Sequence, residues 1–160
     1  MIPQALEEYL NKSNVWYEVR HHPPTMTAEQ LAQRENVDGH KVAKVVVMRE
    51  DGAYYMMVLP ASYFIDIREA RRLTGHPNLH FASESELQQA FQDCELGAMP
   101  PMGRLYNMPV YSETDLSDDD EIEFNAGTHE DAVRMKYADW EKMAEPQKAH
   151  FARNWREYLA

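Results

Sequence analysis

Several residue types and patterns are scarce in this chain of 160 residues. It has one cysteine, Cys94, which cannot form an internal disulfide and which fits a reducing cytoplasm. No apolar run approaches the roughly 20 residues that span a bilayer, and the N-terminus lacks the pattern of a signal peptide. Lys and Arg number 16 against 27 Asp and Glu, a net charge of −11. This charge argues against a protein that holds nucleic acid mainly by neutralising phosphates. We expect a cytoplasmic protein with one domain, residues 1–160, and no membrane partner.

The motifs of several enzyme classes are also absent. There is no Gly-x-Ser-x-Gly elbow, no phosphate-binding P-loop and no dinucleotide fingerprint. Cys94 has no partner in a Cys-x-x-Cys pair, so a core thiol is the better interpretation. His76 and His80 are four residues apart, but Pro77 between them spoils a helical metal site. We therefore expect no bound metal and no cofactor.

Hydrophobic periodicity and capping residues predict a mixture of helices and strands. The expected helices are residues 3–12, one capped by Thr27 with Gln30, one from Asp66 to Leu73, one capped by Ser83 with Glu86, and residues 137–143. The expected strands cover residues 16–20, 42–48, 54–59, 79–81, 109–111, 122–124 and 132–136, with a hairpin turn at Asp51-Gly52. Residues 147–160 carry an apolar stripe and predict a C-terminal amphipathic helix.

Lys44 is the unusual residue of the strand at 42–48. Its neighbours are apolar and mostly β-branched, so the strand is expected to be buried. An ammonium buried without a partner costs several kcal/mol, roughly the penalty known for ions in proteins. Two interpretations remain open. Either Lys44 reaches water at the edge of the sheet, or it faces a cleft in which an anionic group meets it.

Residues 97–103, Gly-Ala-Met-Pro-Pro-Met-Gly, predict a rigid loop with unusual backbone angles. Successive exposed backbone N–H groups in such a loop can form an anion-binding nest. Proline has no N–H, so the donors would come from residues such as Gly97, Ala98, Met102 or Gly103. A plain connecting loop explains the same residues.

Three stretches together resemble the YbaK/prolyl-tRNA-synthetase-associated domain family. They are the strand around Lys44 in residues 42–47, the Gly-x-x-Pro motif at residues 97–100, and the late strand with its Ala-Gly turn in residues 124–129. The resemblance covers about residues 15–145. It implies an α+β fold, with a curved, partly closed and mainly antiparallel sheet surrounded by helices. It also implies an aminoacyl-tRNA deacylase that edits mischarged tRNA in trans.

The resemblance further implies the roles of particular residues. Lys44 corresponds to a lysine that anchors the substrate near its terminal adenosine or aminoacyl group, and Gly97 and Ala98 begin the loop placed against the aminoacyl ester. Residues with implied substrate contacts are Pro100, Met102, Gly103 and His129. Ester hydrolysis needs stabilisation of the negative charge on the carbonyl oxygen, which preorganised backbone N–H groups can supply. No obvious general base is present, so we expect the substrate's own ribose hydroxyl to activate water.

The implied partners are the acceptor end of a mischarged tRNA, charged with a small amino acid and most often a tRNA for proline, and an aminoacyl-tRNA synthetase. Arg68, Arg71 and Arg72 form the one compact basic cluster, which a solvated helix face explains equally well. Two alternatives remain. One is a non-catalytic module on the same fold that binds an aminoacyl-like ligand or a protein, and the other is a hydrolase of another small acyl ester.

Overall fold

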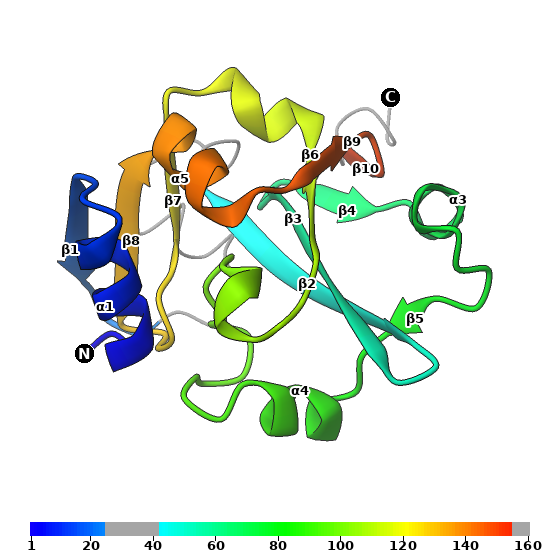
Figure 1. The fold of residues 1–160 in the computed structure, drawn as a ribbon, viewed down its shortest axis with the longest axis horizontal. Helices are drawn as coiled ribbons and strands as arrows, with labels where there is room; N and C mark the ends of the chain where they lie inside the picture. The colour runs from blue at the N-terminus through cyan, green and yellow to red at the C-terminus, as the bar shows by residue number, and fades with distance from the viewer. Residues whose placement is uncertain (25–41, 155–160) are drawn as a thin grey trace.

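The computed structural model describes residues 1–24 and 42–154 (Figure 1). The expected helix capped by Thr27 lies outside the described residues. The α-helices are α1 (Gln4–Lys12), α3 (Ile67–Thr74), α4 (Glu84–Ala90) and α5 (Tyr137–Ala144), with short 3-10 helices η1 (Gly103–Leu105) and η2 (Thr114–Asp118). The strands are β1 (Tyr17–His21), β2 (Ala43–Glu50), β3 (Ala53–Pro60), β4 (Tyr63–Ile65), β5 (His80–Phe81), β6 (Val110–Glu113), β7 (Glu121–Asn125), β8 (Asp131–Lys136), β9 (Gln147–Ala149) and β10 (Ala152–Asn154).

The central sheet has five strands in the order β5-β2-β3-β6-β9. Strands β2 and β3 form the expected antiparallel hairpin, with Lys44 opposite Leu59. Its turn residues Asp51 and Gly52 have φ values of 51° and 83°. A tight two-residue turn needs positive φ at both positions, which is why the Asp-Gly pair predicts it correctly. Strands β6 and β9 extend the sheet in parallel pairing.

A second sheet, β1-β8-β7, is antiparallel and stands beside α1 and α5 (Figure 1). It meets the central sheet at one parallel bridge between Val42 and Glu123. Strands β4 and β10 form a separate antiparallel pair. The α+β class and the mainly antiparallel pairing are therefore confirmed. The strands of the described residues form three open sheets, however, so the expected partial closure is not found.

The β2–β3 hairpin separates two apolar clusters, because side chains alternate between the faces of a strand. The larger cluster lies on the face of Ala43 and Val47 and also contains Met99, Met102 and Trp140. The smaller cluster lies on the opposite face and contains these residues: Met48, Met57, Leu59, Tyr63, Ala70, Leu79, Tyr111 and Phe151. The hairpin is thus covered on both faces, by the larger core on one side and by α3 on the other.

Two helix starts follow the predicted capping chemistry. The Asp66 side chain accepts hydrogen bonds from the backbone N–H groups of Arg68 and Glu69 at the start of α3. Ser83 and Glu86 form a complete capping box at the start of α4. Such caps satisfy N–H groups that have no partner inside the helix. Among residues 1–24 and 42–154, no helix is both long enough and apolar enough to cross a bilayer.

The predicted C-terminal helix is wrong for residues 147–154, which form β9 and β10 instead. Strand β9 pairs with β6, and β10 pairs with β4. Between them, Phe151 is almost fully buried in the smaller cluster. The apolar residue that suggested a helical stripe therefore anchors an extended segment, because tertiary pairing overrides a weak local preference. Residues 155–160 lie outside the described residues.

Candidate functional site

The glycine–proline loop, residues 97–103, touches the surface at one end only. Gly97 is exposed and has a φ of 85°, a left-handed conformation that favours glycine. The next six residues are all buried. At Gly103, an added Cβ would lie 2.2 Å from the Met108 carbonyl oxygen, so no larger residue fits. Pro100, Met102 and Gly103, which were expected to contact substrate, are therefore enclosed by protein, and the accessible part of the loop is Gly97.

The loop is fixed to the Ala-Gly turn, residues 126–130, which connects β7 to β8. The N–H of Gly127 donates to the carbonyl of Ala98 at 2.7 Å, and the N–H of Glu95 donates to the carbonyl of Gly127 at 2.7 Å. Gly127 has a φ of 91°, and an added Cβ would lie 2.4 Å from the ring of Pro3. Two sequence motifs that are 30 residues apart thus form one rigid junction.

His129 completes this junction. Its backbone N–H donates to the Glu95 carboxylate at 3.0 Å, and its Nε2 lies 2.7 Å from the Leu96 carbonyl oxygen. A carbonyl only accepts, so Nε2 is the donor of this hydrogen bond. The structure therefore places His129 against Glu95 and Leu96, the two residues that precede Gly97. No sequence motif pointed to Glu95, and its contact with His129 is evident only from the structure.

Only some of the backbone N–H groups in the loop already donate a hydrogen bond within the protein. Ala98 N–H donates to the Glu95 carbonyl, and Met102 N–H donates to the Pro100 carbonyl. These two groups were candidates for the predicted nest and are already used inside the loop. The Gly97 N–H has no acceptor within residues 1–24 and 42–154. Because Gly97 is also the exposed residue, its N–H is the loop donor that can reach a ligand.

Lys44 occupies the second position of β2 and is half-buried. Its Nζ donates to the Ala61 carbonyl at 3.2 Å. It lies opposite Leu59, a member of the smaller cluster, whereas Met99 and Met102 pack with Ala43 on the other face. The pleat of β2 thus directs Lys44 away from the face on which the glycine–proline loop packs.

Asp131, the first residue of β8, fixes the Ala-Gly turn through its side-chain hydrogen bonds. Its buried carboxylate accepts hydrogen bonds from Thr128 Oγ1 at 2.7 Å, from His21 Nδ1 at 2.9 Å and from the Met1 amino group at 2.6 Å. Burial raises the pKa of Asp131, but these hydrogen bonds outweigh burial and lower the pKa to about 2. The carboxylate is therefore charged at neutral pH and acts as a structural acceptor.

Cys94 precedes the loop and does not behave as a nucleophile. Its Sγ lies 3.2 Å from the Tyr106 hydroxyl and 3.3 Å from Asp93 Oδ1. Burial is the main reason that the pKa of the thiol rises to about 12. A nucleophilic cysteine needs a lowered pKa, so Cys94 is a packing residue, in agreement with the sequence interpretation.

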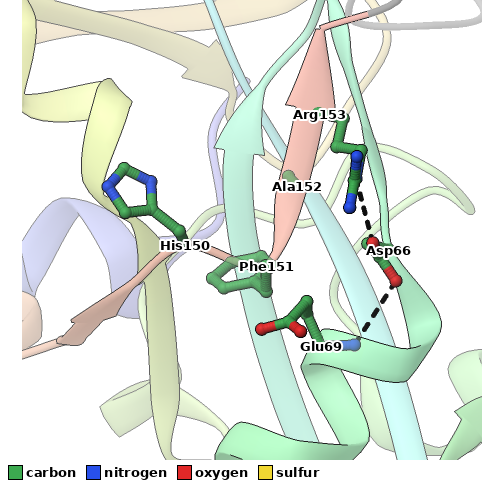
Figure 2. Close-up of a pocket in the computed structure, with 6 residues that line it drawn as sticks. All are labelled: Asp66, Glu69, His150, Phe151, Ala152 and Arg153. Atoms are coloured by element: carbon green, nitrogen blue, oxygen red, sulfur yellow. Dashed lines mark hydrogen bonds and ion pairs between the residues drawn. The ribbon is translucent and has the colours of Figure 1, made fainter. Parts of the chain in front are cut away.

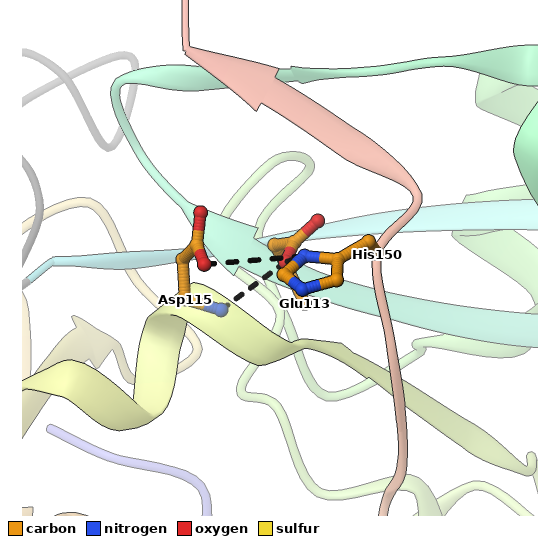
Figure 3. Close-up of side chains that lie close together, drawn as sticks. All are labelled: Glu113, Asp115 and His150. Atoms are coloured by element: carbon orange, nitrogen blue, oxygen red, sulfur yellow. Dashed lines mark hydrogen bonds and ion pairs between the residues drawn. The ribbon is translucent and has the colours of Figure 1, made fainter.

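One cluster of potential metal ligands was not predicted, because His150 is far in sequence from its other two members. Figure 3 shows Glu113, Asp115 and His150, whose ligand atoms lie within 4.8 Å of one another. Glu113 is fully buried. Its Oε1 accepts from the N–H groups of Phe151 and Ala152, and its Oε2 accepts from Asp115 N–H and His150 Nδ1. Because the carboxylate accepts hydrogen bonds from four donors, it has no further capacity to accept one. It fixes the connection between β9 and β10, and we call Glu113 with these four donors the clasp.

Comparisons with known proteins show the family and the fold. Residues 22–143 match the aminoacyl-tRNA editing domain family. The chain belongs to this family. The matched segment contains the β2–β3 hairpin, the glycine–proline loop and the Ala-Gly turn. A similar protein from Escherichia coli strain K12, the multifunctional Ser/Thr-tRNA deacylase ProXp-y, is 24% identical over 155 residues, which cover 94% of this chain and 92% of that protein.

Two solved structures share the fold of this editing domain. One, assigned as a trans-editing enzyme for prolyl tRNA synthetase, has a TM-score of 0.81 and 22% identity, covering 93% of this chain and 95% of the other. Another, the hypothetical protein APE2540, has a TM-score of 0.85 and 16% identity, covering 94% of this chain and 100% of the other. At these identities the likeness concerns the fold.

Proposed function

We propose that this protein is an aminoacyl-tRNA deacylase that removes a small amino acid from mischarged tRNA in trans. The observation that carries the proposal is the junction of the glycine–proline loop with the Ala-Gly turn, inside the segment that matches the editing family. This junction holds an exposed backbone donor, the Gly97 N–H, in a fixed position. Such a preorganised donor accelerates ester hydrolysis by stabilising the negative charge that develops on the carbonyl oxygen.

The proposed reaction adds water to the ester carbon and releases the amino acid from the ribose oxygen of the tRNA. Negative charge develops on the carbonyl oxygen, and the Gly97 N–H donates a hydrogen bond to it. Ala98 keeps Gly97 in place through its carbonyl, which accepts from Gly127. The ribose hydroxyl next to the ester accepts a proton from the attacking water as it passes its own proton to the departing ribose oxygen, so the products are the free amino acid and an unesterified ribose. The protein then contributes mainly by positioning the ester and the water.

His129 and Lys44 are proposed to hold the two ends of the substrate. His129 sits beside Leu96 and Gly97, where its ring can contact the aminoacyl group. Lys44 lies on the other face of β2 but close to the start of the strand, where its ammonium can offset the charge of a terminal phosphate. We expect Lys44→Ala to lower kcat/KM about tenfold, the effect of losing roughly 1.4 kcal/mol. Full activity in a folded Lys44→Ala protein would remove Lys44 from the site.

The amino acid is proposed to be alanine, serine, threonine or cysteine. The family resemblance favours small residues on tRNA for proline, and the name of the E. coli relative favours serine and threonine. An aminoacyl-tRNA synthetase that releases the mischarged tRNA is the proposed protein partner, which is supported by the likeness to a trans-editing enzyme for prolyl tRNA synthetase.

The test is a deacylation assay on tRNAs charged with alanine, cysteine, serine, threonine and proline. We expect hydrolysis of at least one mischarged tRNA well above the uncatalysed rate, with the correctly charged prolyl-tRNA spared. Hydrolysis of simple amino acid esters in preference to every charged tRNA would favour a general acyl esterase. No turnover on any of these substrates would contradict the proposed function.

A further inference from the structure

We infer that the arginine face of α3, formed by Arg68, Arg71 and Arg72, holds the phosphates of the tRNA acceptor stem. This inference rests on the proposed function and adds the surface that would bind the nucleic acid. It addresses a problem set by composition, because a protein with a net charge of −11 repels RNA unless cations are gathered locally.

The helix presents these arginines together. Ala70 is fully buried, and Ile67 and Leu73 pack against the smaller cluster, so the opposite side of α3 faces outward. Arg68 is followed by Arg71 and Arg72 at three and four residues, a spacing that places all three on one side of a helix. Arg68 and Arg72 are exposed. Arg71 is held in place because its Nε donates to the Leu79 carbonyl at 3.0 Å.

Arg68 is poorly placed for the stability of the helix itself. It lies in the first turn, where the positive end of the helix dipole favours acidic residues and disfavours cations. Among residues 1–24 and 42–154, no carboxylate pairs with its side chain, whereas the exposed Arg104 pairs with Glu145 at 2.6 Å. An unpaired guanidinium at a position that disfavours it is better explained by binding than by folding.

The basic surface continues beyond α3 onto β10. Figure 2 shows Arg153 directed at Asp66, with Nε 2.9 Å from Oδ2, and both residues line an open pocket of about 260 Å³. Glu69 is paired with Arg72 at 2.8 Å. The two carboxylates are therefore each matched by an arginine, and the charges of Arg68 and Arg71 remain in excess. Arginine forks match phosphate oxygens well, which favours a phosphate ligand.

Helix α3 and Lys44 lie on the same side of the β2–β3 hairpin. Helix α3 covers the face of the hairpin to which Lys44 points, since Ala70 and Leu59 share one cluster. The Ala61 carbonyl that binds Lys44 directly precedes β4, which leads into α3. Ala61 and Ile67 are separated by six residue steps, so their Cα atoms lie at most about 22 Å apart. A stem lying on α3 would thus bring its unpaired 3′ nucleotides to the start of β2.

The test compares Arg68→Gln/Arg72→Gln with a matched control, Lys136→Gln/Lys142→Gln, which removes two exposed cations from β8 and α5. Each protein is assayed on a charged full-length tRNA and on the corresponding aminoacyl-adenosine, which has no stem. We expect the arginine variant to lose about 10- to 30-fold in kcat/KM on the tRNA, mostly through KM, and to keep its activity on aminoacyl-adenosine. For uncharged tRNA, the slope of log affinity against log salt should fall by about 1 to 2, as for two lost phosphate contacts.

Equal losses on both substrates, an equal loss in the lysine control, or no loss on tRNA would each overturn the inference. Arg68→Lys/Arg72→Lys keeps the charge and should retain most of the tRNA affinity. If the wild-type protein hydrolyses neither substrate, the proposed function fails, and the affinity for uncharged tRNA alone decides the inference. Weaker binding in the glutamine variant would then still support the surface, whereas unchanged binding, or stronger binding to anionic vesicles than to tRNA, would refute it.

Discussion

Two regions of this molecule fix irregular backbone in opposite ways. At the loop–turn junction, the contacts are mostly between backbone groups. Gly103 and Gly127 permit close approaches, and Gly97 has a left-handed backbone conformation. At the clasp, a single buried carboxylate, Glu113, collects three backbone N–H groups and His150. The junction leaves the exposed N–H of Gly97 without an acceptor in the described residues, whereas the clasp leaves no lone pair of Glu113 uncommitted. A rigid segment with a spare donor is suited to binding, and a saturated carboxylate is suited to structure.

The largest effect expected from this comparison is on stability. Replacing Glu113 with glutamine puts an amide NH₂ where donors already converge, so at least one buried N–H loses its acceptor. We expect Glu113→Gln to lower the free energy of unfolding by about 3 kcal/mol, measured by urea denaturation, while the folded fraction keeps its deacylase activity.

Glu145→Gln is the matched control for the clasp, since the Glu145–Arg104 pair is exposed and such pairs contribute little. If Glu113→Gln lost more activity per folded molecule than Glu145→Gln, Glu113 would belong to the functional site. The contrast between a binding junction and a structural clasp would then be wrong.

The next effect concerns the junction and is on activity. Gly97→Ala places a Cβ on a residue with a φ of 85°, which strains the backbone and turns the N–H away from its position. We expect kcat to fall about 100-fold, the lower end of the range for losing one oxyanion donor, with a smaller change in stability. Gly75→Ala, at the end of α3 with a φ of 73°, imposes a similar strain elsewhere and should leave kcat unchanged. Equal losses of activity in the two variants would contradict a special role for Gly97.

The carboxylate below the junction provides a prediction on pH. Because the pKa of Asp131 is lowered from 3.8 to about 2 in the folded protein, its stabilising contribution is present above pH 3.8 and is lost as the pH falls towards 2. We expect Asp131→Asn to be less stable than wild type by roughly 2 kcal/mol at pH 6, and this gap to narrow at pH 2.5 in urea titrations. A gap that stays constant with pH would mean that the charge of Asp131 contributes nothing.

The smallest effect is expected at Cys94. With the pKa of the thiol near 12, very little thiolate exists at neutral pH. Cys94→Ser should keep full deacylase activity, and iodoacetamide at pH 7.5 should modify the wild-type thiol slowly. Rapid alkylation with parallel loss of activity would place the cysteine in the site.

The contrast between junction and clasp also explains what the sequence could predict. The junction is marked by glycines and prolines whose backbone constraints are local, and the Asp51-Gly52 hairpin and the Asp66 and Ser83 caps were predicted for the same reason. The clasp joins Glu113 to residues 150–152, and no local pattern signals a carboxylate that captures distant N–H groups. Without such a signal, the apolar stripe of residues 147–160 predicts a helix, which is wrong for residues 147–154.

Lys44 illustrates a further limit. The sequence marked it correctly as a charge in a buried strand, but the side to which it points depends on which cluster covers each face of β2. That assignment follows from α3 and Phe151 packing on one face and from the glycine–proline loop packing on the other.

The account depends most on the claim that the aminoacyl ester binds at the exposed end of the glycine–proline loop. The most direct measurement is a titration of the ¹⁵N-labelled protein with an aminoacyl-adenosine analogue whose ester is replaced by a stable amide, followed through backbone amide resonances. The account predicts saturable shifts of the Gly97 and His129 amides, with little change in residues 150–153. Saturable shifts confined to residues 150–153, with the Gly97 resonance unmoved, would contradict it.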